Sequence, residues 1–207
     1  MTDSKEHLQA LTDIRSMMER SSRFISLSGL SGIFAGIFAL CGAYAAYIKL
    51  HSLDEMYRLL NRDALNDLII YLLEDAALVL VASLLVGILL TSRNSKKKGI
   101  KIWDTTSKRL LINLLIPLVT GGLFCLVLLF DGLVGLVAPA TLIFYGLSLI
   151  NASKYTFNDI RYLGFCEIIL GLIASLYNGY GLFFWAAGFG VLHIIYGAVM
   201  YFKYERN

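Results

Sequence analysis

Charged side chains are scarce in this chain. Asp, Glu, Lys and Arg make up 16% of its 207 residues, whereas 57% of the residues are hydrophobic. In an ordinary soluble domain about a quarter of the residues are charged. The shortage of charge therefore excludes a soluble globular domain and indicates that the lipid bilayer is the solvent for most of this chain.

Cysteine and histidine are also rare, with three residues of each. Cys41, Cys125 and Cys166 each lie in an apolar stretch without paired spacing, so we expect buried thiols rather than disulfides or metal ligands. The sequence contains no zinc-protease H-E-x-x-H, no G-x-S-x-G elbow and no Walker lysine loop. We therefore expect no catalytic residues, no cofactor and no bound metal, and predict that the protein is not an enzyme.

Six apolar stretches are each long enough to cross a bilayer core of ~30 Å, which takes about 20 helical residues. Together they occupy nearly the whole chain, so we predict one polytopic, all-α membrane domain over residues 1–207. Its six transmembrane helices would form three in-out-in hairpins. The expected spans are about 24–48, 68–91, 110–130, 133–150, 160–177 and 182–202.

Two segments outside these spans have the periodicity of amphipathic helices. Residues 1–22 form a leader whose apolar positions from Leu8 to Met18 recur every three or four residues among charged ones. Residues 53–67 repeat this pattern and lead into the second span. We expect the leader at the cytoplasmic surface and the second segment at the outer surface.

Lysine and arginine are distributed unequally between the two sides of this topology. Fifteen of the eighteen lie in the N-terminal, even-numbered and C-terminal connecting segments, and three lie in the others. Cytoplasmic segments carry such an excess, so we predict a bacterial inner-membrane protein with both termini cytoplasmic. Because this positive charge sits at helix ends, where topology requires it, we expect the lipid bilayer and not a nucleic acid as the partner.

Seven of the fifteen cationic residues lie in the connecting segment 92–109, which we predict to be a basic cytoplasmic loop. Such density favours contact with anionic lipid headgroups or with a cytoplasmic partner protein, although orientation alone accounts for much of it. The candidate contact residues are Lys96, Lys97, Lys98 and Lys101.

Small residues crowd the first span. Gly29, Gly32 and Gly36 share one helix face, and the latter two form a GxxxG pair, which allows another helix to approach closely. The partner helix could belong to the same chain or to a second copy in a homo-oligomer. In a six-helix protein, packing within the chain is the more common case.

Glu167 and His193 are the most informative ionisable residues inside the predicted spans. Each lies thirteen residues from Tyr180, in the turn of the last hairpin, so both should sit at the same depth, roughly 20 Å from that turn. A carboxyl group beside an imidazole can relay a proton or bind a ligand. The alternative is a buried hydrogen-bonded pair that fixes how two helices pack.

Glu74 and Asp75 are secondary candidates in the second span. They are adjacent, so on a helix they point about 100° apart and cannot both face one small cavity. They lie ~24 Å along the helix from the inner end of that span. A solvated helix end is therefore the simpler interpretation, and a cation site is the alternative.

The first and fifth spans open alike, with Arg23-Phe24-Ile25 matched by Arg161-Tyr162-Leu163. This similarity would fit parallel internal repeats. Shared membrane composition accounts for it equally well.

Three stretches resemble uncharacterised multi-span membrane proteins common in bacteria of the Bacteroidetes type. They are residues 21–32, residues 139–146 together with 151–155, and residues 188–197. The resemblance implies an inner-membrane location and no assigned activity, and it carries over no functional residues.

Two classes of function remain open. The first is a non-enzymatic membrane assembly or accessory module, which would associate with itself or with a partner protein. The second is a small-solute or ion transporter with a proton-linked site at Glu167 and His193. A transporter needs these two residues to line a path to at least one membrane surface, whereas a purely structural pair would be enclosed and bonded only to itself.

Overall fold

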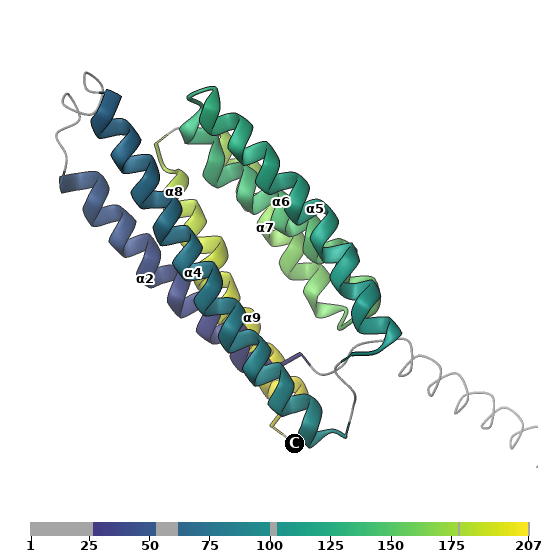
Figure 1. The fold of residues 1–207 in the computed structure, drawn as a ribbon. Coiled ribbons are helices and arrows are strands. Elements are labelled where there is room, and N and C mark those ends of the chain that lie inside the picture. Colours follow the sequence, from purple (N-terminus) through teal and green to yellow (C-terminus); the bar gives the residue numbers. More distant parts are fainter. Residues whose placement is uncertain (1–26, 53–61, 100–102, 178, 207) are drawn as a thin grey trace, which may run out of the picture.

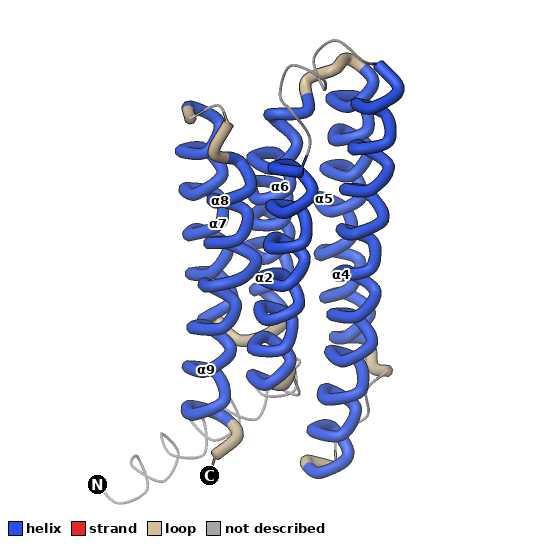
Figure 2. Tube along the Cα trace, turned by 90° about the vertical axis from the view of Figure 1, so that its left-hand side faces the viewer, coloured by secondary structure: helices blue, strands red, loops and turns tan. Residues whose placement is uncertain are grey.

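A computed structural model describes residues 27–52, 62–99, 103–177 and 179–206 of the chain. Within these residues all regular structure is helical, and Figure 2 shows the long helices running along one common axis. The predicted amphipathic leader, most of the predicted outer helix and Lys101 lie outside the described residues.

The helices follow the order of the predicted spans. An α-helix runs into the seven-residue π-helix η3 and then into another α-helix, so the last span is a composite. Two 3₁₀ turns, η1 and η2, flank α6. The bounds are α2 Gly29–Ser52, α4 Arg62–Lys97, α5 Thr105–Phe130, η1 Val134–Leu136, α6 Val137–Ala152, η2 Ser153–Tyr155, α7 Asp159–Leu176, α8 Gly181–Trp185, η3 Ala186–Leu192 and α9 His193–Tyr204.

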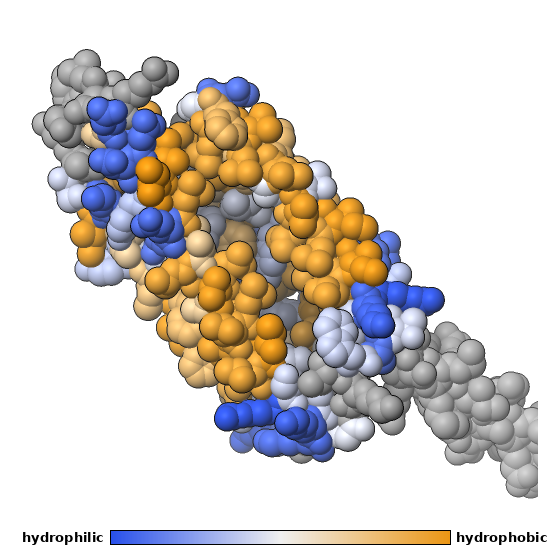
Figure 3. Space-filling view, in the orientation of Figure 1, coloured by the Kyte–Doolittle hydropathy of each residue, from blue (hydrophilic) through white to orange (hydrophobic). Residues whose placement is uncertain are grey.

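Five helices among the described residues are long and apolar enough to cross a membrane. They are Gly29–Ser52, Asp63–Lys97, Thr105–Phe130, Val134–Tyr155 and Gly181–Tyr204. α7 covers the expected fifth span but is not one of the five, because its 18 residues include Asp159, Arg161 and Glu167. Figure 3 shows apolar side chains over the middle of the molecule and hydrophilic ones toward its ends, as a bilayer requires.

The helices form two groups. α2 packs against α4 and against the composite helix α8–η3–α9, and we call these the first bundle. α6 packs against α5 and α7, which form the second bundle. Figure 1 shows the two bundles side by side, so the last helix of the chain returns to the first two.

Glycine allows the closest helix contacts within each bundle. A Cβ atom added at Gly36 of α2 would lie 2.6 Å from the carbonyl oxygen of Gly190, and one added at Gly32 would lie 3.1 Å from the Cα of Gly197. Gly29 is equally close to the backbone of Tyr201. The glycine face of α2 is therefore occupied by the last helix of the same chain.

The predicted basic loop 92–109 is wrong in its extent. α4 continues to Lys97 and α5 begins at Thr105, so Lys96 and Lys97 are exposed on the last turn of a helix. Charged side chains do not end a helix, because long polar residues have good helix propensity. α4 ends instead where Gly99 adopts a φ of 64°, a conformation that suits glycine.

Asp104 fixes the start of α5. Its Oδ1 accepts hydrogen bonds from the backbone N–H of Ser107 at 2.6 Å and from the Ser107 hydroxyl at 2.5 Å. Burial would raise the pKa of Asp104, but these hydrogen bonds outweigh burial and hold the pKa below its usual value.

The glycine contacts predict a selective sensitivity to a single methyl group. Gly36→Ala and Gly146→Ala should each destabilise the protein by about 1–3 kcal/mol, because the new Cβ meets a backbone carbonyl. Gly87→Ala and Gly122→Ala are matched controls, since their Cβ atoms enter open space. The controls should be neutral or stabilising by up to ~1 kcal/mol. Thermal unfolding in detergent measures the difference, and equal effects in both pairs would contradict it.

The capping contact predicts a pH-dependent helix start. Asp104→Ala should cost about 1 kcal/mol of stability, whereas Thr105→Ala should cost less, because Thr105 does not cap the helix. Because the pKa of Asp104 is lowered, the cap contributes fully above the usual Asp value and is lost as pH falls through the lowered one. Unfolding midpoints of both variants, compared with wild type at neutral and acidic pH, test this. A deficit of Asp104→Ala that persists unchanged in acid would count against it.

Candidate functional site

Glu167 and His193 meet between the two bundles. Glu167 lies on α7 in the second bundle and His193 opens α9 in the first. The Oε1 atom of Glu167 is 3.4 Å from the Nδ1 atom of His193, so the two side chains lie at the same depth, as the sequence predicted. Glu167 is fully buried, and His193 is 7% exposed.

Two further groups contact the imidazole of His193. Its Nδ1 is 3.0 Å from the carbonyl oxygen of Gly188, and its Nε2 is 2.8 Å from the Tyr145 hydroxyl. A carbonyl can only accept, so Nδ1 carries the proton in the tautomer that satisfies both contacts, and Nε2 accepts from Tyr145. The imidazole of His193 therefore lies between the Tyr145 hydroxyl, which it bonds, and the Glu167 carboxyl group, which it approaches.

The π-helix η3 makes room for this arrangement. Single π-helical turns inside α-helices are rare and occur often at functional sites, where they displace the backbone from its regular path. Gly188 lies in η3, and a Cβ atom there would collide with Oε2 of Glu167 and lie 2.5 Å from Leu142. The carboxyl group thus occupies the space left by the missing side chain of Gly188.

The carboxyl group of Glu167 is incompletely satisfied. Neither of its oxygens has a hydrogen-bond partner among the described residues, although Oε1 lies near the His193 ring. An unsatisfied buried polar group costs roughly 1–3 kcal/mol, and a charged one costs more. A carboxyl group in this state contributes little to holding the two bundles together.

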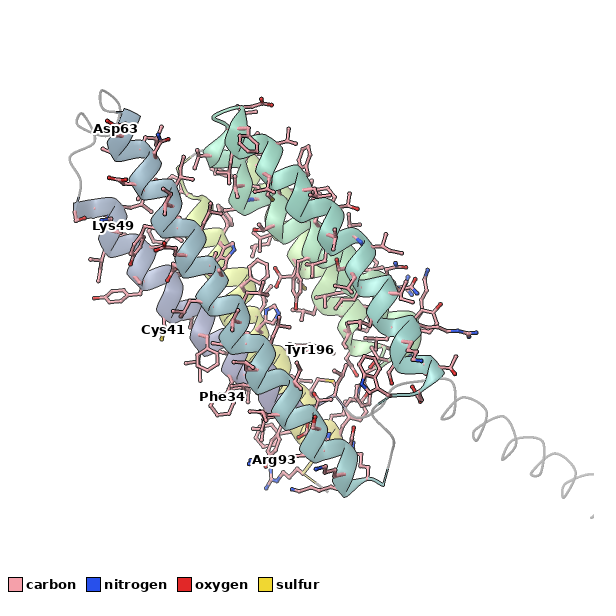
Figure 4. All side chains as sticks on the ribbon, in the orientation of Figure 1. Phe34, Cys41, Lys49, Asp63, Arg93 and Tyr196 are labelled. Carbon is pink, nitrogen blue, oxygen red and sulfur yellow. The ribbon has the colours of Figure 1, made fainter. Side chains whose placement is uncertain are left out.

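Aromatic rings surround the imidazole. The ring centroids of Tyr145 and Phe189 lie 5.4 Å and 5.9 Å from that of His193, and Trp185 lies 5.0 Å from Phe189. Tyr196, one turn along α9, faces the second bundle in Figure 4 and packs against a cluster that contains Leu163. The site is therefore enclosed. The aromatic rings leave the polar atoms of Glu167, His193 and Tyr145 few hydrogen-bond partners other than each other.

Tyr145 was missed by sequence reasoning, although one signal could have found it. It follows Gly132, in the turn between α5 and α6, by thirteen residues. Glu167 and His193 lie at the same spacing from their own turn. Counting depth on every hairpin, rather than on the last one alone, would have placed all three side chains at the same level of the membrane.

Glu74 and Asp75 do not join this site. Glu74 is exposed on α4, and Asp75 is half-buried within the first bundle, where its Oδ2 would lie 3.1 Å from a Cβ atom added at Gly42. The two carboxyl groups thus diverge, as adjacent helical residues must.

Among the residues that the structure describes, no three His, Cys, Asp or Glu side chains gather as metal ligands. No protein-family model, curated protein or solved structure matches this chain. The resemblance to membrane proteins of the Bacteroidetes type therefore stays a prediction.

The environment of Glu167 predicts that removing the carboxyl group stabilises the fold. Glu167→Met should raise the free energy of unfolding by about 1–3 kcal/mol, because it eliminates an unsatisfied buried group at similar volume. Leu142→Met is the control, and its effect should stay below about 1.5 kcal/mol. A loss of stability in Glu167→Met would mean that the carboxyl group holds the bundles together. Chemical or thermal unfolding in detergent distinguishes the two.

Proposed function

We propose that this protein is a membrane carrier that couples the movement of a small solute or ion to a proton held by Glu167 and His193. The observation that carries the proposal is a fully buried, incompletely satisfied carboxyl group placed beside an imidazole between two helix bundles. Ionisable groups inside a membrane are costly and mark ion pathways and proton relays. Carriers place such groups near the midplane between units that move.

The chemistry of the site supports a proton that can be exchanged. The Tyr145 hydroxyl donates to Nε2 of His193, and Oε1 of Glu167 lies 3.4 Å from Nδ1 of the same ring. While the bundles enclose the site, water reaches neither Glu167 nor, beyond a small fraction of its surface, His193. When the bundles part and water enters, a proton held by these two residues can leave or be replaced. Both residues are enclosed, so the path to a membrane surface that a transporter needs is closed in this structure. The proposed carrier must therefore open by moving its bundles apart.

The alternative, an assembly module, receives less support. One of its expected surfaces, the glycine face of α2, is covered by α9 of the same chain. The amphipathic leader and part of the basic segment, its other expected surfaces, lie outside the described residues. His193 also contacts Tyr145 and Gly188, so Glu167 and His193 are not bonded only to each other. Enclosure and these contacts of His193 also fit a structural role, so the carrier proposal depends on the unsatisfied carboxyl group of Glu167.

For orientation we propose six spans in the bacterial inner membrane, with α7 as the fifth and both termini cytoplasmic. The bundles shield Glu167 of α7 from lipid, so its charge does not oppose insertion. Asp159 and Arg161 lie on the first turn of α7, which this orientation places at the boundary between the membrane and water. The end of α4 carries the exposed lysines Lys96 and Lys97, which supports placing this end on the cytoplasmic side.

Reconstitution into liposomes that enclose a pH-sensitive dye tests the function. Vesicles with wild-type protein should show an internal pH change when small cations, amines, organic acids or sugars are added in turn. Glu167→Gln should reduce the response to that of protein-free vesicles, since it removes the proton site and keeps the side-chain volume. Glu74→Gln is the matched control, because Glu74 is exposed on α4, and it should behave as wild type.

Two outcomes would contradict the proposal. Equal responses from wild type and Glu167→Gln would exclude a proton-linked site at Glu167. An absence of any response from wild type, across all solutes, would favour the assembly module.

A further inference from the structure

Two helix pairs in different bundles pack in the same register. A Cβ atom added at Gly36 of α2 would lie 2.6 Å from the oxygen of Gly190 and 3.0 Å from the nitrogen of Ile194. One added at Gly146 of α6 would lie 2.6 Å from the oxygen of Gly164 and 3.0 Å from the nitrogen of Ile168. The α2–α9 contact, with its preceding turn η3, is thus repeated in the α6–α7 contact.

The sequence repeats with the contacts. Residues 33–36 read Ile-Phe-Ala-Gly and residues 143–146 read Ile-Phe-Tyr-Gly. Residues 164–171 read Gly-Phe-Cys-Glu-Ile-Ile-Leu-Gly and residues 190–197 read Gly-Val-Leu-His-Ile-Ile-Tyr-Gly. Glu167 and His193 therefore occupy equivalent positions of the two repeats.

The repeats are inverted with respect to each other. Gly29, at the start of α2, lies beside Tyr201 near the end of α9, and Asp159, at the start of α7, bonds Lys203 at that same end. α2 and α7 therefore run in one direction, and α6 and α9 run in the other. The repeat concerns packing and not chain order, since α6 and α7 are consecutive whereas α2 and α9 are the first and last described spans.

Contacts between α7 and the composite helix occur at three levels. At the inner end, Asp159 accepts hydrogen bonds from Lys203 at 2.9 Å and from the Tyr204 hydroxyl at 2.6 Å. Glu167 and His193 form the middle level. At the outer end, the ring centroids of Tyr177 and Phe184 are 6.3 Å apart. The end contacts lie roughly 12–15 Å from the middle level along the helices.

The end contacts also follow the repeat in part. The residue shift that carries Glu167 to His193 also carries Tyr177 to Lys203, and it carries Asp159 to Trp185, which is next to Phe184. One partner of the outer contact is therefore at the position equivalent to an inner partner, and the other differs by one residue. The inner closure is polar, and the outer closure is aromatic.

We propose that the two glycine-packed pairs move as the halves of an inverted repeat, with an inner gate of Asp159, Lys203 and Tyr204 and an outer gate of Tyr177 and Phe184. This inference rests on the proposed carrier function. Separation of the inner gate opens Glu167 and His193 to the cytoplasm, and separation of the outer gate opens them to the other side. Since the glycine contacts keep each pair rigid, the two openings exclude each other.

Thiol labelling in sealed vesicles of both orientations tests the gates. Cys41, Cys125 and Cys166 are first replaced by Ala, and a single cysteine is then introduced by Leu163→Cys or Ala138→Cys. Leu163 packs in the inner half of the interface, and Ala138 lies 3.3 Å from a Cβ atom added at Gly181 in the outer half. A membrane-impermeant maleimide reports access to each position from its own side.

Breaking the inner gate should shift the two labelling rates in opposite directions. Asp159→Ala should accelerate labelling of the cysteine at 163 from inside by about two- to fivefold, the range expected when an ion pair of this exposure is lost. It should slow labelling at 138 from outside by a smaller factor, because the enclosed state stays the most populated one. Lys203→Gln, at a more exposed position, should give the same pattern more weakly. Asp131→Ala removes an equal charge from the turn between α5 and α6, inside one bundle, and should change neither rate.

Acceleration at both positions would indicate general loosening and overturn the gates, as would no change at either position in both gate variants. Labelling requires no proton movement, so the two proposals fail separately. If the two labelling rates shift in opposite directions but solute flux into liposomes does not need Glu167, the gates are supported and the proton-linked carrier is contradicted. Flux that needs Glu167, without opposite shifts, would overturn the gates alone.

Discussion

Backbone contact at glycine is the constraint on which this architecture depends. Lipid tails are as apolar as leucine, so helices in a bilayer gain little by burying apolar side chains against each other. They gain instead from van der Waals contact, which is strongest where no side chain separates two backbones. α2 uses Gly29, Gly32 and Gly36 for this purpose against α9, and α6 uses Gly146 against α7. The two bundles form around these contacts, and the interface between them is packed differently.

The interface between the bundles carries the polar groups. Asp159 bonds Lys203 and Tyr204 at one end, and Glu167 meets His193 in the middle. Polar contacts of this kind can be exchanged for water when surfaces separate, whereas glycine contacts cannot. The proposed movement of the two bundles would separate these polar contacts and leave the glycine contacts within each bundle intact. The buried carboxyl group lies on the surface that such motion would expose.

The site could be predicted in part. Equal spacing from one turn brought Glu167 and His193 together, because depth in a hairpin follows directly from the helical rise. The contact between His193 and Gly188 could not be predicted, because it depends on the π-helix η3, and no sequence rule places a π-helix. Tyr145 belongs to another hairpin, and its contact with His193 depends on how α6 lies against the last helix. The similarity between the two glycine-containing segments can be read from the sequence. Only the structure shows that the equivalent glycines make equivalent contacts with neighbouring backbones.

Length, apolar content and the uneven distribution of lysine and arginine determined that this is a helical membrane chain, because lipid admits few other structures. They also determined the order of the helices and, through depth, which side chains could share a level. The sequence left open which helices are neighbours, since every apolar face suits lipid as well as another helix. The tertiary structure decided that the last helix returns to the first, that the first span packs within its own chain, and that Glu167 faces His193 across the interface of two bundles. These choices depend on complementary shapes of whole helices, which no local pattern of residues contains.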